Sequence, residues 1–184
     1  EKANLLVAAL LDLKSKVVQR KSAVAVHPDT GLSKMEPRLN INKIEGGLKT
    51  NIIPDQCLIS VDRRLIPEEN LEEAEKELMD TLSSVKGVNW EIAKIHRIPT
   101  VPPCQDPIVD ELARTIEEIT EQSGKFGEMG SGDLPYIVTS EWGAKEFGLG
   151  VIRAECNIHG KNEFVYQKDI EDLAEIISRF LSPV

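Results

Sequence analysis

Apolar residues recur every three to four positions in four long stretches of the chain, and this spacing predicts four amphipathic helices. In the first stretch, Leu6, Leu10 and Val17 fall on one helical face. Asn70 precedes the second stretch and is a candidate N-cap. A shorter helix is expected near 135–147. The four long helices are predicted at about 3–20, 71–85, 108–119 and from about Lys168 to the end of the chain.

Alternating apolar and polar residues predict a pair of strands between the first two helices. Leu39 and Ile41 alternate with asparagines, which predicts a strand that ends near Glu45, just before two glycines. The second strand is expected at 56–65. Its odd-numbered positions from Cys57 to Val61 are apolar, and its even-numbered positions from Ser60 to Arg64 are polar. The sequence therefore predicts an amphipathic hairpin with one face toward a core.

Two further strands are expected later in the chain. Val88, Trp90 and Ile92 alternate with polar residues, which predicts a third strand after the second helix. Apolar residues and glycines predict a buried strand at 147–152. Prolines gather between Pro99 and Pro107, and such a segment is typical of a domain boundary. We therefore expect two domains, 1–98 and 99–184.

The composition restricts the class of partner. The formal net charge is −9, from 22 basic and 31 acidic side chains. This balance argues against nucleic acid and against anionic membrane surfaces, both of which need a basic face. The longest apolar run, Leu5–Leu11, is too short to cross a membrane. The three cysteines form no CxxC pair, which favours reduced thiols and a cytoplasmic protein. A small molecule or a peptide is the expected partner.

Two stretches carry candidate chemistry. Asn51 precedes the second strand and Arg64 lies on its polar face, and an amide with a guanidinium suits the binding of a carboxylate. A surface hairpin with a solvated arginine is the alternative. His159 follows the expected buried strand, where imidazole is a plausible zinc ligand. A structural histidine is the alternative there, and no second cysteine near Cys156 supports a Cys/His metal pair.

Together these stretches resemble the zinc-dependent aminoacylase, acetylornithine deacetylase, succinyl-diaminopimelate desuccinylase and glutamate carboxypeptidase family. Members carry a glycine pair, Asn-x-Ile-Pro, Asp-x-Arg and a nearby proline, and later a glycine-rich strand, a histidine, Asn-Glu and a terminal helix. The matching residues are Gly46-Gly47, Asn51-Ile52-Ile53-Pro54, Asp62-Arg63-Arg64, Pro67, Gly148-Leu149-Gly150, His159 and Asn162-Glu163.

The resemblance implies an α+β lid followed by part of a catalytic domain. Residues 1–98 would form an incomplete ferredoxin-like lid, lacking its first strand, through which members form homodimers. Residues 99–184 would form the C-terminal part of the α/β zinc-peptidase catalytic domain. His159 matches a metal ligand, and Asn51 and Arg64 match lid residues that bind the substrate's carboxylate.

One further family position is matched less well. The family places a glycine and then Ser/Thr-Asp in a loop whose backbone faces the substrate, which here assigns Ser131 to substrate binding. Gly132 stands where a hydroxyl residue is expected.

The chemistry of such a hydrolase needs more ligands than this sequence shows. Family members bind two divalent ions, usually zinc, with cobalt or manganese as alternatives, through a His-x-Asp, a Glu-Glu pair and a further acidic ligand. His27 and His96 lack such neighbours. We therefore expect a fragment that binds no complete metal centre and has no hydrolase activity alone. The parent would hydrolyse an amide next to a carboxylate, in an N-acyl amino acid or small peptide. The alternative is a non-catalytic dimerisation or small-ligand-binding module.

Overall fold

The structure is a computed structural model that describes residues 1–122, 124–130, 132–139, 144–145, 147–151 and 153–182. The chain divides into two compact units. The first unit comprises Glu1–Ala23 and Lys34–Pro102, and the second comprises Val24–Ser33 and Pro103–Val184. This division of contacts does not test independent folding, so the two domains at 1–98 and 99–184 stay a prediction.

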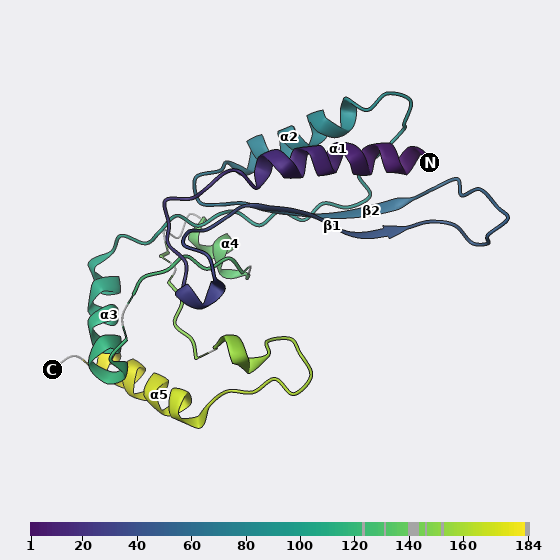
Figure 1. Cartoon of the computed structure of the whole chain (residues 1–184). Coiled ribbons are helices and arrows are strands. Elements are labelled where there is room, and N and C mark those ends of the chain that lie inside the picture. The colour runs from purple at the N-terminus through teal and green to yellow at the C-terminus, as the bar shows by residue number, and fades with distance from the viewer. Residues whose placement is uncertain (123, 131, 140–143, 146, 152, 183–184) are drawn as a thin grey trace. The chain divides into compact units, whose positions relative to one another are not determined.

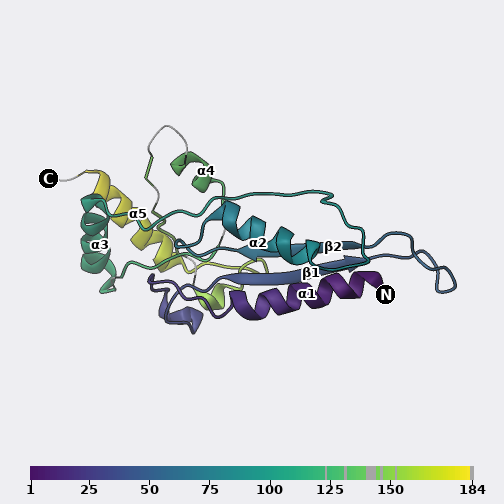
Figure 2. The ribbon, with the colours of Figure 1, turned by 90° about the horizontal axis from the view of Figure 1, so that it is seen from above.

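The first unit is a β-hairpin with two helices on one side of it (Figure 1). Its strands pair antiparallel, and an irregularity between Ile41 and Lys43 shifts the register. Seen from above, both helices run lengthwise along the hairpin, whose turn extends beyond them (Figure 2). The elements are α1 (Lys2–Val17), β1 (Arg38–Glu45), β2 (Leu58–Arg64) and α2 (Leu71–Ser83). These bounds confirm the predicted hairpin and its two flanking helices.

The core of the first unit lies between α1 and the apolar face of the hairpin. Leu13 and Val17 of α1 pack with Leu39 of β1, and all three are buried. Val61 and Leu78 complete the cluster from β2 and α2. Leu39, Ile41, Val61 and Ile59 share this face because they lie across from one another or two positions apart in the ladder. The predicted alternation of the hairpin is therefore confirmed.

The helix α2 begins where the sequence indicates. The Asn70 side chain accepts a hydrogen bond from the Glu73 N–H at 3.0 Å, which satisfies one of the unpaired donors of the first turn. Asn70 itself has an extended backbone, as an N-cap requires. The predicted N-cap is confirmed.

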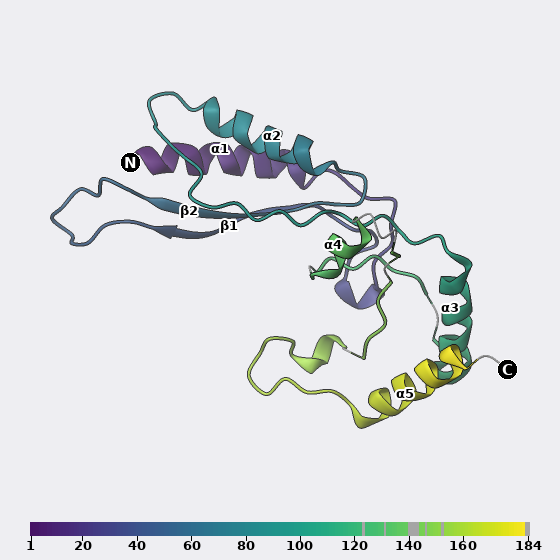
Figure 3. The ribbon, with the colours of Figure 1, turned by 180° about the vertical axis from the view of Figure 1, so that it is seen from behind.

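The third strand predicted at 88–92 is wrong. Residues 88–92 are described and carry no strand, although Val88 and Trp90 are half-buried while Asn89 and Glu91 are exposed. The segment turns back and runs lengthwise past the hairpin without joining its ladder (Figures 1 and 3). The alternation correctly indicates Val88 and Trp90 as half-buried positions, whereas Ile92, which it assigns to the same face, is 49% exposed. A strand also needs a backbone partner in register, which a local pattern cannot supply.

The second unit contains two packed helices and several short elements. Helix α3 (Pro107–Thr120) packs against α5 (Gln167–Leu181). Asp106 caps α3 by accepting a hydrogen bond from the Ile108 N–H at 3.0 Å. The short elements are η1 (Pro28–Thr30), α4 (Leu134–Val138) and η2 (Ala154–Cys156).

Two expectations for the second unit need correction. The helix expected at 135–147 is α4, which ends at Val138; residues 140–143 and 146 lie outside the described part of the chain. The buried strand expected at 147–152 is wrong for 147–151, which form no strand, and Phe147 and Leu149 are 36% and 37% exposed. An apolar segment becomes a buried strand only when it joins a sheet that is covered on both faces.

The terminal helix is confirmed, but it does not bury the apolar stripe that helical spacing indicates. Ile170, Ile177 and Leu181 recur at that spacing and are exposed, whereas Ile176 is 4% exposed. Helix α3 covers only some of the apolar side chains of α5. The exposed apolar side chains of α5 are Ile170, Ile177 and Leu181. Among the described residues, no helix has the length and apolar character needed to span a membrane.

Candidate functional site

Asn51 lies in the turn between β1 and β2, at the projecting end of the hairpin. The turn depends on two glycines. A Cβ at Gly46 would come within 3.0 Å of the Gln56 carbonyl oxygen, and Gly47 has a φ of 91°. Asn51 is exposed, and Leu48 and Ile53 near it are 94% and 93% exposed. The turn therefore presents an amide and several apolar side chains outside the unit's own core.

Arg64 lies at the opposite end of the hairpin. It is the last residue of β2 and pairs in the ladder with Arg38, the first residue of β1. Since β2 has seven residues and each step advances about 3.3 Å, Arg64 lies roughly 20 Å or more from the turn. Asn51 and Arg64 of one chain are therefore not brought together, so a carboxylate bound by both would need residues from two chains.

The Arg64 side chain is on the polar face of the hairpin. Its Nε lies 3.0 Å from Asp62 Oδ2, and both side chains remain substantially exposed. This pair keeps the guanidinium near the sheet but leaves part of it accessible to solvent. An exposed ion pair of this kind contributes little to stability. Breaking the pair with Asp62 would therefore cost the fold little free energy.

The neighbouring arginine, Arg63, points to the other face and is nearly buried. Its guanidinium is ion-paired with Glu69, and the two side chains are 10% and 11% exposed. Arg63 Nη1 also donates to the Arg64 carbonyl at 2.5 Å. Glu69 further accepts from Arg20 Nη1 at 2.8 Å and from the Ile66 N–H at 3.1 Å. This cluster ties the end of β2 to the start of α2.

The cluster shifts the ionisation of its carboxylate. Burial alone raises the pKa of Glu69, but the bonds from Arg63, Arg20 and the Ile66 N–H outweigh it, so the pKa lies below its ordinary value. The pKa of Glu68 is also lowered, first by the Ala23 N–H, and Ser22 Oγ donates to the same carboxylate at 2.8 Å. Sequence reasoning missed this role. The available signal was an acidic pair, Glu68-Glu69, that begins four residues after a strand ending in two arginines.

His159 lies in the loop between η2 and α5. Its side chain is exposed, and its backbone has a φ of 61°, which is uncommon for a residue with a side chain. The His159 N–H donates to Glu163 Oε2 at 3.1 Å. At the neck of the loop, the Phe164 N–H donates to the Cys156 carbonyl at 3.1 Å. Hydrogen bonds therefore hold the loop in a defined shape while the imidazole faces solvent.

The base of this loop is anchored by an ion pair. Arg153 Nε donates to Asp169 Oδ2 at 2.6 Å, and the guanidinium lies 4.9 Å from the centre of the Tyr166 ring. The hydrogen bonds from Arg153 lower the pKa of Asp169. This geometry joins the residue before η2 to the first turn of α5, so both ends of the His159 loop are fixed.

The donor set near His159 fits one metal ligand rather than a complete metal site. An exposed imidazole on an ordered loop is a suitable transition-metal ligand. Within the described ranges, however, no three His, Cys, Asp or Glu side chains gather closely enough to hold a metal ion. Ser131, the third expected substrate-binding residue, lies outside the described residues, and the described glycines beside it, Gly130 and Gly132, lie in a loop.

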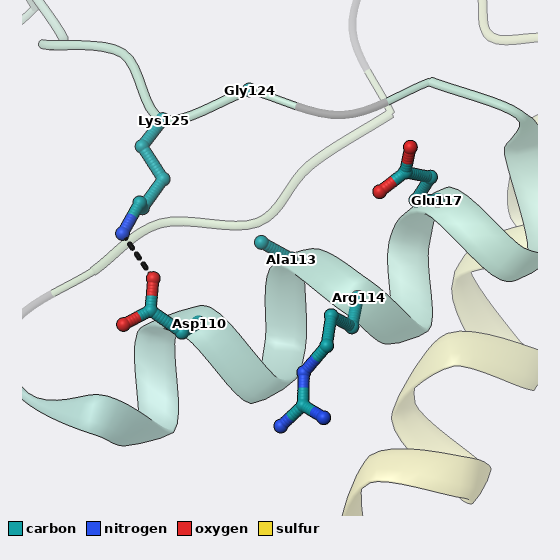
Figure 4. A pocket seen from close by; sticks show the side chains of 6 residues that line it. All are labelled: Asp110, Ala113, Arg114, Glu117, Gly124 and Lys125. Atoms are coloured by element: carbon teal, nitrogen blue, oxygen red, sulfur yellow. Dashed lines mark hydrogen bonds and ion pairs between the residues drawn. The ribbon is translucent and has the colours of Figure 1, made fainter.

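An open depression of about 390 Å³ lies beside α3 in the second unit (Figure 4). Lys125 faces Asp110 across it and forms an ion pair with it. Its lining contains none of the predicted site residues and mixes both signs of charge. It is lined by Asp110, Ala113, Arg114, Glu117, Gly124 and Lys125.

The comparisons with known proteins concern the first unit. A comparison with curated proteins found no match to the chain. Residues 3–89 match the family model of the peptidase dimerisation domain, M20_dimer. The matched region contains α1, the hairpin with Asn51 and Arg64, and α2. This match supports a relationship of residues 3–89 to the dimerisation domain of the M20 peptidases, a family of generally metal-dependent hydrolases.

Proposed function

We propose that this chain supplies the dimerisation lid, the substrate-carboxylate contacts and one metal ligand of a metal-dependent amidohydrolase. The observation that carries this proposal is the match of residues 3–89 to the peptidase dimerisation domain. The motif order supports it further, because His159 and Asn162-Glu163 follow the lid in the order that the resemblance requires. The proposed substrate is an N-acyl amino acid or small peptide with a free carboxylate near the scissile amide.

The separation of Asn51 and Arg64 supports a role in a dimer. A strand's length divides them within one chain. The turn that carries Asn51 projects beyond the two helices of its own unit (Figures 1 and 2). In the proposed homodimer, the turn of one chain reaches the site of its partner, where its amide donates to the substrate. Arg64 donates charged hydrogen bonds to a substrate carboxylate. Before the substrate binds, Asp62 holds the Arg64 guanidinium in position.

His159 would hold one of two divalent ions, zinc or alternatively cobalt or manganese, with the remaining ligands and the general base supplied by other polypeptide. When bound, such ions polarise an amide carbonyl and activate a water molecule for attack. The residues of this chain bind and orient the substrate. Hydrolysis by this arrangement adds water across the amide C–N bond and releases a carboxylate and an amine. The 184 residues alone are expected to show no turnover.

The dimer is tested by sedimentation equilibrium of the full chain. The proposal expects a dimer at micromolar concentration, dissociated by Ile44→Asp, because Ile44 is 53% exposed on the hairpin. Ile177→Asp is the matched control, since Ile177 is 43% exposed in the second unit and lies outside the residues that match the dimerisation domain. A monomer at all concentrations would overturn the proposed lid function.

The hydrolase assignment is tested by assay and by ligand binding. With zinc or cobalt added, the purified chain should release no amino acid from N-acetylated substrates, and measurable turnover would contradict the proposed division of ligands. An N-acetyl amino acid should nevertheless perturb the Arg64 guanidinium resonances, and Arg64→Lys should weaken that effect because lysine lacks the planar fork. Equal perturbation by the amidated analogue, which lacks the carboxylate, would count against a carboxylate site.

A further inference from the structure

The loop that carries His159 is ordered by its own hydrogen bonds. Asn157, His159 and Asn162 all have a φ between 56° and 61°, the left-handed region. Residues with side chains seldom adopt this conformation, so three within six positions need compensating contacts. Gly160 is required here as well, because a Cβ on it would come within 2.3 Å of the Asn157 side chain.

Three hydrogen bonds within the loop supply these compensating contacts. The Gly160 N–H donates to the Asn157 carbonyl at 2.7 Å, and Asn157 Nδ2 donates to the Lys161 carbonyl at 2.8 Å. Glu163 Oε2 accepts the His159 N–H at 3.1 Å. Of these bonds, only the last involves His159 itself, and it joins the histidine to a carboxylate four residues away. A hydrogen bond to a charged acceptor is stronger than one between neutral groups.

We propose that Glu163 is a positioning residue for His159. Its carboxylate holds the histidine backbone in the left-handed conformation, and this fixes the direction in which the imidazole leaves the loop. The inference rests on the proposed function, in which His159 is a metal ligand. Glu163 acts on the backbone amide, whereas metal-ligating histidines are more usually oriented through the second ring nitrogen. The Arg153–Asp169 pair fixes the loop's base, and Glu163 fixes its tip.

The backbone role is tested by NMR of the full isotopically labelled chain without metal. Glu163→Ala should change the His159 three-bond HN–Hα coupling, which depends on φ, and accelerate exchange of the His159 amide by about tenfold. Glu163→Gln should largely restore both, because its amide oxygen still accepts a hydrogen bond. Glu155→Gln is the matched control: it removes the same charge from η2 and should leave both values unchanged. Unchanged values in Glu163→Ala would overturn the positioning role.

The consequence for metal binding is tested with Co²⁺ alone, followed by paramagnetic broadening of the loop resonances. Co²⁺ should broaden residues near His159, Glu163→Ala should weaken binding by about tenfold, and Glu163→Gln should recover most of it. If Glu163→Gln binds as weakly as Glu163→Ala while the His159 coupling is retained, Glu163 is a ligand, and the proposed effect of its backbone contact on metal binding is overturned. If the unsubstituted chain shows no broadening at His159, the proposed metal role fails, and the metal-free measurements still decide the backbone role of Glu163.

Discussion

The two units of the chain use different means to order the residues proposed to form a site. In the first unit, Leu10, Val17 and Leu39 are each at most 1% exposed, and two helices cover one face of the hairpin. In the second unit, α3 and α5 each bury one apolar residue, Leu112 and Ile176. Burial on this scale cannot by itself fix the long connections of the second unit. The His159 loop depends instead on backbone and ionic hydrogen bonds.

This difference suggests how the two kinds of site respond to change. The hairpin is positioned by a core, so its residues keep their direction as long as the core is intact. The His159 loop is positioned by a few polar contacts at the protein surface, and water competes for each of them. We therefore expect core substitutions to have large effects in the first unit and small ones in the second.

The largest effect is expected for Leu39→Ala in the first unit. Leu39 packs with Leu13 and Val17, and truncating such a buried leucine removes apolar contacts and leaves a cavity. The free energy of unfolding of this unit should fall by about 3 kcal/mol. The measurement is urea unfolding followed by the NMR resonances of each unit separately.

Leu48→Ala is the control for that measurement. Leu48 is 94% exposed in the hairpin turn, so its truncation should change the unfolding free energy by less than about 0.5 kcal/mol. Equal losses for the two leucines would contradict the core described here for the first unit.

A smaller loss is expected for Glu69→Gln, which leaves Arg63 nearly buried without its counter-charge. The unfolding free energy at pH 7 should fall by about 2 kcal/mol, the size of a hydrogen bond to a charged group. The effect should depend on pH. The folded-state pKa of Glu69 is lowered, so its contribution is present above the ordinary glutamate value of 4.5 and is lost as the pH falls below it.

The pH dependence gives Glu69→Gln a clear readout. Between pH 7 and pH 3 the unsubstituted first unit should lose stability more steeply than the variant, since glutamine does not titrate. Glu91→Gln, at an exposed position outside the cluster, should follow the unsubstituted protein. Parallel curves for all three proteins would show that the Arg63–Glu69 pair contributes no net stability.

The sequence predicted features that depend on neighbours along the chain. The alternation of Ile59 and Val61 with Asp62 and Arg64 identified both faces of β2, and Asn70 was identified as the N-cap of α2. These features need only the local periodicity or one side chain close to one amide. The same local reasoning placed His159 in a loop before the terminal helix, and its metal role stays a prediction. The hydrogen bond from the His159 N–H to Glu163 became visible only with the backbone conformation.

Features that depend on distant partners were not predictable in this way. The segment 88–92 alternates correctly but finds no strand to pair with. The grouping of Arg20, Arg63 and Glu69 joins positions up to 49 residues apart, and only the packing of α1 beside α2 brings them together. The separation of Asn51 from Arg64 is different, because it already follows from the length of the predicted strand between them; what a single sequence does not supply is the second chain that would bring them together.

Asn70→Ala should have an effect of about 1 kcal/mol on the first unit, the usual loss for removing an N-cap. The variant leaves the Glu73 N–H without its 3.0 Å acceptor. Asn70→Asp retains an acceptor and should restore most of the stability. The same urea titration measures both variants, and a loss for Asn70→Asp equal to that of Asn70→Ala would exclude capping as the cause.

The smallest effect is expected for Ile177→Ser in the second unit, and it tests the comparison most directly. Ile177 is 43% exposed, and Ile170 and Leu181 lie on the same outward stripe of α5 at spacings of seven and four residues. If this stripe faces solvent in solution, the substitution should change the unfolding free energy by less than about 0.5 kcal/mol. Ile176→Ala, at the adjacent position that is 4% exposed, should cost clearly more.

The pair of α5 variants separates two explanations for the sparse packing of the second unit. If Ile177→Ser is neutral and Ile176→Ala is not, α3 alone supports α5, and the unit depends on its polar contacts as described. If Ile177→Ser is as damaging as Ile176→Ala, another surface covers the stripe in solution. Repeating the measurement over a range of protein concentrations then identifies that surface. A loss that grows with concentration shows self-association through α5, because binding to the folded state adds stability that rises with the logarithm of the partner concentration. A loss that is independent of concentration shows that α5 packs more tightly within its own unit. Apolar burial would then order both units, and the second unit would depend less on its hydrogen bonds.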